Sequence, residues 1–235
     1  MKKSVESLCR KYYPVKTDPF RDCILRYLRN GDIIVDAGCG NGSQYKYNLK
    51  NMAKEIIGVD TCDDIGKNDN VTRCLKDSID NISISDESVD IIISRYVFEH
   101  IKDPEKVLKE FKRILKPGGK VIFLTPNRFN YVYLISSMTP QSFHLWVNKI
   151  RTDDTMAEKD TFPTYYKLNY GRAIRTNALK AGLEVKETIF FEPRPAYLVF
   201  TPWLFRLGVL YERIVNKVSA FSSLRGIIIG VLAKV

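Results

Sequence analysis

The sequence lacks any apolar run close to the roughly 20 residues that a membrane-spanning helix requires, so no segment is expected to cross a bilayer. The chain starts Met-Lys-Lys, but the apolar stretch of a signal peptide does not follow. The five cysteines are odd in number and include no C-x-x-C pair, so neither a disulfide framework nor a zinc site is indicated. These absences predict a protein of the reducing cytoplasm that holds no metal.

Basic residues outnumber acidic ones, and the formal net charge is +10. Such a charge can steer a protein onto nucleic acid or an anionic membrane. The basic residues are nevertheless scattered, and those in residues 102–120 alternate with apolar positions, as on the solvated face of a helix. The RNA-binding signature of the Lys/Arg-Gly-Phe type is also missing. A small molecule or a glycan is therefore expected as substrate, and no nucleic acid.

The stretch IIVDAGCGNG at residues 33–42 is the most informative part of the chain. An apolar strand runs directly into Gly38, Gly40 and Gly42. Glycine tolerates positive φ and lets a ligand approach the backbone closely. In an open α/β sheet such a turn lies at the carboxyl end of the first strand, where ligands bind. The pattern predicts a site for a nucleotide-like cofactor, although glycines of this kind can also serve only a tight turn.

The spacing around this turn narrows the choice of cofactor. A dinucleotide fingerprint requires a third glycine at position 43, which is Ser43, and no Gly-Lys-Ser/Thr of a P-loop follows. Asp60 ends the next apolar run, residues 56–59, and an acid about 20 residues past the glycines suits the two hydroxyls of an unphosphorylated ribose. The alternative role of Asp60 is to cap a helix that begins near Cys62.

Several motifs occur in the order that is typical of one family. They are VDAGCGNG at 35–42, GVD at 58–60, LKDS at 75–78, SVDIIIS at 88–94, VFEHI at 97–101 and RILKPGG at 113–119. With them the chain resembles the class I S-adenosylmethionine-dependent methyltransferases over residues 31 to about 127. The resemblance implies S-adenosylmethionine as cofactor. It does not specify the acceptor, because such enzymes share the cofactor half and diverge in the rest.

The resemblance also implies roles for individual residues. The glycine turn would lie against the methionine portion of the cofactor. Asp36 would act through its charge near the cofactor ammonium, or would cap the turn. Asp60 would accept hydrogen bonds from both ribose hydroxyls. Asp77 would meet the adenine amino group, with the backbone of Ser78 nearby, unless Asp77 is only a solvent-exposed loop acid.

The acceptor side has to align a nucleophile with the methyl group and, for a hydroxyl, remove a proton. The sequence contains two histidines, and imidazole is the natural base near neutral pH. His100, directly after the fourth strand, is the predicted catalytic base, with a structural role in the turn as alternative. His144 is predicted to pack or to shape the acceptor site. Arg95, Tyr96 and Asn127 follow strands four and five and should border the acceptor pocket, where Asn127 positions a hydroxyl or caps the following segment.

Periodicity predicts an α/β fold. The expected elements are entry helices within 4–29 broken at Pro14 and Pro19, strands at 32–37, 55–60, 71–76, 89–94, 120–125, 183–191 and 227–233, and helices at 43–52, 104–116 and 169–181. Alternating strands and helices predict a parallel sheet with right-handed crossovers. The resemblance refines this to a Rossmann-like, seven-stranded, mostly parallel sheet with helices on both faces, in which the last strand runs antiparallel between the fifth and sixth.

The whole chain, 1–235, is expected to form one domain. Its parts are an N-terminal helical segment (1–30), the cofactor-binding core (31–127), an aromatic-rich inserted lid (126–168) and a C-terminal sheet half (169–235). Long inserts at this edge of a sheet are usually binding loops. No motif specifies an oligomeric state.

An amphipathic helix is expected over residues 203–218. One face carries Trp203, Leu207, Leu210, Tyr211, Ile214 and Val218, and the other carries Arg206, Arg213, Asn216 and Lys217. Such a helix most often packs on its own domain. The second interpretation is a helix in a membrane interface, which would place the protein at the inner face of the membrane and make a lipid-linked glycan the acceptor. Segments 125–129 and 160–166 also resemble bacterial methyltransferases of envelope-sugar pathways.

Three functions remain open on the sequence. The first is methyl transfer to a small molecule or an envelope sugar, most plausibly on oxygen. The second is cofactor binding without catalysis. The third, a nicotinamide-dependent oxidoreductase, is disfavoured by Ser43.

Overall fold

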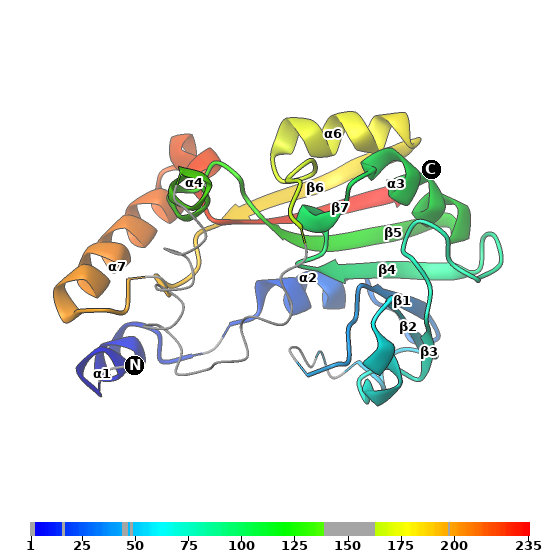
Figure 1. The fold of residues 1–235 in the computed structure, drawn as a ribbon, viewed down its shortest axis with the longest axis horizontal. Helices are drawn as coiled ribbons and strands as arrows, with labels where there is room; N and C mark the ends of the chain where they lie inside the picture. The colour runs from blue at the N-terminus through cyan, green and yellow to red at the C-terminus, as the bar shows by residue number, and fades with distance from the viewer. Residues whose placement is uncertain (1–2, 16, 44–46, 48, 139–162, 197) are drawn as a thin grey trace. The chain divides into compact units, whose positions relative to one another are not determined.

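The computed structural model describes residues 3–15, 17–43, 47, 49–138, 163–196 and 198–235 (Figure 1). The chain divides into two compact units. The sheet unit consists of Asp18–Thr125, Thr164–Ile189 and Ile229–Val235, and the helical unit of Met1–Thr17, Pro126–Pro163 and Phe190–Ile228. The expectation of one domain over 1–235 stays a prediction.

A seven-stranded sheet has the order β3-β2-β1-β4-β5-β7-β6. The strands are β1 (Ile33–Ala37), β2 (Glu55–Val59), β3 (Arg73–Leu75), β4 (Val89–Arg95), β5 (Leu115–Pro126), β6 (Leu183–Phe191) and β7 (Ile227–Lys234). The first five strands pair in parallel, and the antiparallel β7 lies between β5 and β6. The fold class expected from the sequence is confirmed.

Both units contain helices. The sheet unit contains α2 (Pro19–Tyr27), α3 (Pro104–Ile114), α6 (Gly171–Lys180) and the short 3-10 helices η1 (Asp63–Lys67) and η2 (Phe98–His100). The helical unit contains α1 (Lys3–Tyr12), α4 (Tyr131–Met138), α7 (Pro202–Lys217) and the 3-10 helix η4 (Ser219–Leu224). Within the sheet unit, α3 and α6 pack side by side (Figure 1). No helix in the described part of the chain is both long and apolar enough to cross a membrane.

Helix α3 shows why its sequence signals were reliable. The carboxylate of Asp103 accepts a hydrogen bond from the backbone N of Lys106 at 3.2 Å, and Pro104 occupies the first turn. The apolar side chains Val107, Leu108, Phe111 and Ile114 form a buried stripe. The helix ends at Ile114, two residues before the predicted end, and β5 begins at Leu115. Pro117 accounts for the difference, because proline disfavours helical backbone at the residue before it.

The helix predicted over residues 43–52 is wrong for the described residues of that segment. Residues 49–54 form turns, in which the backbone N of Met52 donates to the carbonyl of Leu49 at 2.9 Å. Tyr47 and Leu49 are both buried, and two positions two residues apart do not share a helical face. Neighbouring asparagine and serine residues favour turns over helix.

In the helical unit, α1 packs against α7. Val5 and Cys9 of α1 form a buried cluster with Phe205 and Val209 of α7. The predicted amphipathic helix is therefore present, but the face that packs is not the one named from the sequence. The predicted apolar face, from Trp203 to Val218, is largely exposed.

Candidate active site

The turn after β1 has the backbone that its glycines were expected to allow. Gly38, Gly40 and Gly42 have φ values of +80°, +55° and +77°. A Cβ at Gly38 would overlap the side chain of Val97, and one at Gly42 would overlap Asn68. At Gly40 a Cβ would meet nothing within 4 Å, so open space adjoins the middle of the turn. The turn can thus receive a ligand at Gly40.

Polar side chains brace this turn. The carboxylate of Asp60 accepts hydrogen bonds from the backbone N of Gly40 at 2.8 Å and of Cys62 at 2.9 Å. Because each carboxylate oxygen has two acceptor sites, Asp60 keeps capacity for further donors. Asn68 donates to the carbonyl of Gly40 at 3.2 Å, and Asn70 donates to that of Gly42 at 2.9 Å. Sequence reasoning missed both asparagines, because isolated asparagines in a loop carry no periodic signal.

Asp36 lies at the end of β1 and is 7% exposed. Burial, and then the charge of Asp60, raise the pKa of its carboxyl to about 7. No described residue donates a hydrogen bond to this carboxylate, whose ionised form is therefore poorly stabilised. A buried carboxyl of this kind can be satisfied by a cationic group of a ligand.

Asp77 and Ser78 follow β3. The carboxylate of half-buried Asp77 accepts from the backbone N of Ser83 at 2.7 Å, and the carbonyl of exposed Ser78 accepts from Asn81 at 2.9 Å. These contacts shape a loop after β3 and suit the alternative in which Asp77 is a loop acid. The role of both residues toward adenine stays a prediction.

Arg95 is the last residue of β4, and its side chain contacts the start of α2. Its guanidinium forms an ion pair with Asp18 at 3.1 Å and lies 5.8 Å from the ring centroid of Phe20 and 5.9 Å from that of Tyr96. Tyr96 has a φ of +56°, and its backbone N donates to Leu124 at 2.9 Å. A non-glycine residue held in this region stores strain, which is typical of functional sites.

His100 lies in η2, half-buried, and its backbone N donates to the carbonyl of Val97 at 2.9 Å. The neighbouring Glu99, which sequence reasoning did not single out, is buried, and burial raises its pKa to about 7. Its carboxylate accepts from the hydroxyl of Thr125 at 3.2 Å, and that hydroxyl accepts from the amide of Asn169 at 2.6 Å. This cluster joins η2, the end of β5 and the loop before α6.

Asn127 lies in the helical unit, where its polar groups bind backbone. Its amide donates to the carbonyls of Ser223 at 2.7 Å and Arg225 at 2.8 Å, and its side-chain oxygen accepts from the backbone N of Phe129 at 3.2 Å. These contacts match the capping alternative, and a place in the acceptor pocket stays a prediction. His144 falls outside the described residues.

Glu192 joins the same part of the helical unit. Its carboxylate accepts from the amide of Asn130 at 2.9 Å and from the backbone N of Gly226 at 2.5 Å. Burial raises the pKa of Glu192 to about 7. The sequence carried no signal for this residue, since its partners are remote along the chain.

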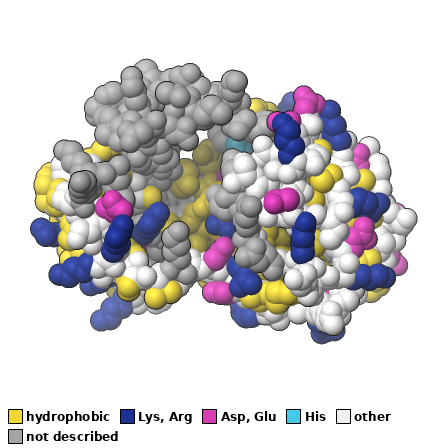
Figure 2. All heavy atoms as spheres, turned by 90° about the horizontal axis from the view of Figure 1, so that it is seen from below, with side chains coloured by type: hydrophobic (Ala, Val, Ile, Leu, Met, Phe, Trp, Pro, Cys, Tyr) yellow, Lys and Arg dark blue, Asp and Glu magenta, His cyan; other side chains and the backbone are white. Residues whose placement is uncertain are grey.

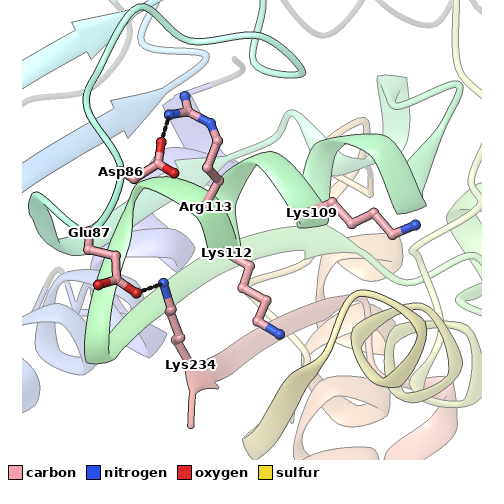
Figure 3. Close-up of a pocket in the computed structure, with 6 residues that line it drawn as sticks. All are labelled: Asp86, Glu87, Lys109, Lys112, Arg113 and Lys234. Atoms are coloured by element: carbon pink, nitrogen blue, oxygen red, sulfur yellow. Dashed lines mark hydrogen bonds and ion pairs between the residues drawn. The ribbon is translucent and has the colours of Figure 1, made fainter.

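A pocket in the sheet unit lies away from the glycine turn (Figure 3). It is lined by Asp86, Glu87, Lys109, Lys112, Arg113 and Lys234. Glu87 precedes β4, whereas the glycine turn follows the parallel strand β1. The pocket therefore lies at the amino ends of the strands and the glycine turn at their carboxyl ends. Arg113 pairs with Asp86 at 2.5 Å and Lys234 with Glu87 at 2.9 Å. Because charged side chains line this pocket throughout, it differs from the mostly apolar pockets that hold small molecules.

On the face drawn in Figure 2, Lys and Arg side chains are scattered rather than gathered in one field. A continuous basic stripe is the usual footprint of nucleic-acid binding. The expectation that nucleic acid is not the substrate stays a prediction.

Known proteins are similar to this chain in sequence and in fold. Residues 35–123 match the family described as a methyltransferase domain. The chain is 28% identical over 141 residues to the ubiquinone biosynthesis O-methyltransferase of Coxiella burnetii, covering 53% of this chain and 59% of that protein. It is 31% identical over 99 residues to the malonyl-(acyl-carrier protein) O-methyltransferase of Yersinia pestis, covering 40% and 37%. The chain thus spans less than two thirds of these curated relatives.

Solved structures extend the similarity over nearly the whole chain. The S-adenosylmethionine-dependent methyltransferase of Mesorhizobium loti gives a TM-score of 0.57 at 16% identity, over 92% of this chain and 96% of that one. The SAM-dependent methyltransferase of Aquifex aeolicus gives 0.53 at 14% identity, over 98% and 97%. At these identities the likeness establishes the fold alone.

Proposed function

Because the chain belongs to the class I S-adenosylmethionine-dependent methyltransferases, we propose that it transfers a methyl group from this cofactor to an oxygen atom of a small-molecule or envelope-sugar acceptor. The observation that carries the proposal is the glycine turn after β1, with open space at Gly40 and the carboxyls of Asp36 and Asp60 beside it. Oxygen as the accepting atom is supported by the two curated relatives, which are both O-methyltransferases.

The residues at the turn fit S-adenosylmethionine. The Asp36 carboxyl, buried and without a described donor, suits the ammonium group of the methionine portion. Asp60 would accept hydrogen bonds from the ribose hydroxyls with the acceptor sites that Gly40 and Cys62 leave open. Backbone at Gly40 would lie against the methionine portion. Asp77 and the backbone of Ser78 are assigned to the adenine.

When bound, the cofactor supplies a methyl group activated by the sulfonium charge. The chain's own residues have to hold the acceptor oxygen in line and remove its proton. We assign proton removal to His100, because it follows β4 in η2 and imidazole exchanges protons near neutral pH. Tyr96 is assigned to contact the acceptor. Arg95 is assigned to position the Tyr96 ring, because its guanidinium contacts both that ring and Asp18.

The lid is assigned to acceptor recognition. Asn127 would act there by holding the start of this segment to residues 223–225, and His144 by shaping the acceptor site. The sequence likeness of segments 125–129 and 160–166 to envelope-sugar enzymes supports a sugar as acceptor. The exposed apolar face of α7 favours a lipid-linked form of that sugar at the inner face of a membrane.

The first test is calorimetric titration of the full chain with S-adenosylhomocysteine, with NADH as control ligand. The proposal expects binding of the first and none of the second. Transfer of a labelled methyl group to sugar and phenol acceptors follows. Binding without transfer to any acceptor would favour a cofactor-binding protein that lacks catalysis, and failure of S-adenosylhomocysteine to bind would refute the cofactor assignment.

Replacing His100 separates catalysis from cofactor binding. His100→Gln should lower the rate of methyl transfer by about 100-fold or more, because general-base catalysis contributes that much, and should leave S-adenosylhomocysteine affinity unchanged. A rate that recovers as pH rises, when hydroxide can replace the base, would identify proton removal as the lost step. Unchanged turnover would exclude His100 as the base.

A further inference from the structure

An apolar stripe follows the exposed face of α7 and continues into η4. Its members are all more than a third exposed: Trp203 (60%), Leu207 (52%), Leu210 (55%), Ile214 (43%), Val218 (39%), Phe221 (42%) and Leu224 (40%). Along α7, the four residues from Trp203 to Ile214 recur at spacings of three and four, so they form one row on the helix, and the other three follow at its C-cap and in η4. We call these seven side chains the α7 stripe.

Among the described residues of the helical unit, the packing of α7 uses the face opposite the α7 stripe. The opposite face of α7 carries Phe205 and Val209, which are buried against α1. Glu212 is also directed toward α1, where its carboxylate accepts from the hydroxyl of Tyr13 at 3.0 Å. Helix α7 is therefore apolar on two opposite faces, one packed and one exposed. Contiguous exposed apolar surface of this kind marks an interaction site more often than single exposed residues do.

Basic side chains line one edge of the α7 stripe. Helix α7 carries three basic residues, Arg206, Arg213 and Lys217, all exposed, against the single acid Glu212. At about 100° per residue, the three basic positions fall together on one side of the apolar row. Because Glu212 is engaged with α1, the exposed side of α7 presents apolar and positive groups.

We propose that the α7 stripe docks on the anionic surface of a membrane. A helix in this position buries its apolar face at the boundary between headgroups and acyl chains, and Arg and Lys reach lipid phosphates while their stems stay apolar. Each basic side chain near such a surface adds attraction. Trp203, at the first turn, is a residue type that favours this boundary.

Charge decides between a membrane and a second copy of the chain. Two copies meeting through the α7 stripe would bring together surfaces of the same sign on chains of net charge +10. An anionic bilayer offers the opposite sign and an apolar interior. The proposal stands on α7 alone, so it can hold even if methyl transfer is not the activity.

The test measures binding of the full chain to sedimented vesicles of phosphatidylcholine, alone or mixed with phosphatidylglycerol. Binding is expected only to the mixed vesicles, and it should weaken as salt screens the charges. Leu207→Ser with Leu210→Ser should lower the partition coefficient roughly tenfold or more, because two leucines no longer leave water. Arg206→Gln with Lys217→Gln should lower it roughly tenfold on the mixed vesicles.

A matched control lies in the sheet unit. Leu179 on α6 is 77% exposed and is adjacent to the basic residue Lys180, as Leu207 is adjacent to Arg206. Leu179→Ser with Lys180→Gln should leave vesicle binding unchanged. All variants should bind S-adenosylhomocysteine as the starting protein does and should unfold at the same urea concentration. A lower partition coefficient would then not be due to unfolding of the variant.

Trp203 also reports insertion directly. The chain has two tryptophans, so the Trp146→Phe variant leaves Trp203 as the sole source of tryptophan emission. Its emission should shift to shorter wavelength on mixed vesicles and should be quenched by brominated lipids. The proposal is overturned by the absence of binding to mixed vesicles at low salt, by equal losses in the α6 control, or by sedimentation that shows a dimer dissociated by the Leu207 and Leu210 changes.

Discussion

If Asp36 binds the cofactor ammonium as proposed, the protonation of this one residue is coupled to cofactor binding. Its pKa is raised to about 7, so the free protein holds a proton there below neutral pH. A bound ammonium group would lower that pKa, and binding would then release a proton. We expect affinity for S-adenosylhomocysteine to rise from about pH 6 to about pH 7 and to level off above it.

Calorimetry in two buffers of different ionisation enthalpy measures the protons released on binding at each pH. Asp36→Asn should bind more weakly at high pH and should show no such proton release. An affinity that is constant over this range in the starting protein would contradict the assignment of Asp36 to the ammonium.

Gly38 and Gly40 provide a matched pair of substitutions. Gly38→Ala combines positive φ with overlap of Val97, and it should cost about 2 kcal/mol or more of unfolding free energy. Gly40→Ala has positive φ but meets no atom within 4 Å, so it should cost only about 1 kcal/mol. Its methyl would occupy the open space, and cofactor affinity should fall more than stability. Urea unfolding and calorimetry separate the two, and a normal affinity in Gly40→Ala would place the ligand elsewhere.

Variants of Asp60 test the proposed hydrogen bonds to the ribose by their effect on ligand affinity. Asp60→Ala should weaken S-adenosylhomocysteine binding by about 1–3 kcal/mol through the loss of charge-assisted hydrogen bonds. Because Asp60 also accepts from Gly40 and Cys62, Asp60→Asn is the matched variant that keeps the shape but removes the charge. Unchanged affinity in both variants would exclude the ribose contact.

At this scale, residues with a local signature were predictable and residues with remote partners were not. The three glycines and the acid at position 60 could be recognised from spacing alone. Asn68 braces the turn only because the fold returns residue 68 to Gly40, and the carboxylate of Glu99 has its donor only because the fold brings Thr125 to it. A single sequence does not show such long-range contacts.

The same division holds among the elements. Helix α3 was predictable because its cap, its proline and its apolar stripe all lie within its own residues. The described residues of 43–52 do not share a helical face, since Tyr47 and Leu49 are both buried. For α7, the sequence indicated a helix but not which face packs, since that depends on α1.

The hydroxyl of Thr125 joins three elements, and this gives a prediction for their stability. Thr125→Val should remove the donor to Glu99 and cost about 1–3 kcal/mol, because a buried polar group then loses its partner. The loss should be larger at pH 8 than at pH 5, since the ionised carboxylate needs the donor more. Thr125→Ser, which keeps the hydroxyl, is the control. Equal losses in both variants at both pH values would show that only packing matters.

Across the described part of the molecule, three carboxyls are buried in the same way, Asp36 and Glu99 in the sheet unit and Glu192 in the helical unit. Each has a pKa raised to about 7, with burial as the largest cause. In the unfolded chain such groups titrate near pH 4. Between about pH 4 and pH 7 the folded protein therefore binds more protons than the unfolded chain. The contribution of these three carboxyls to stability is therefore full below pH 4 and is lost as pH rises through 7.

We expect the free energy of unfolding to fall by a few kcal/mol between about pH 5 and about pH 8, as measured by urea titration. Salt-bridged carboxyls with a lowered pKa, such as Glu110 beside Arg113, act in the opposite direction only in more acidic solution. Glu99→Gln and Glu192→Gln should each reduce the slope, because neutral amides do not titrate. A free energy of unfolding that does not fall with pH over this interval would mean that the three carboxyls are ionised in the folded protein, and the proton release expected at Asp36 would then be absent as well.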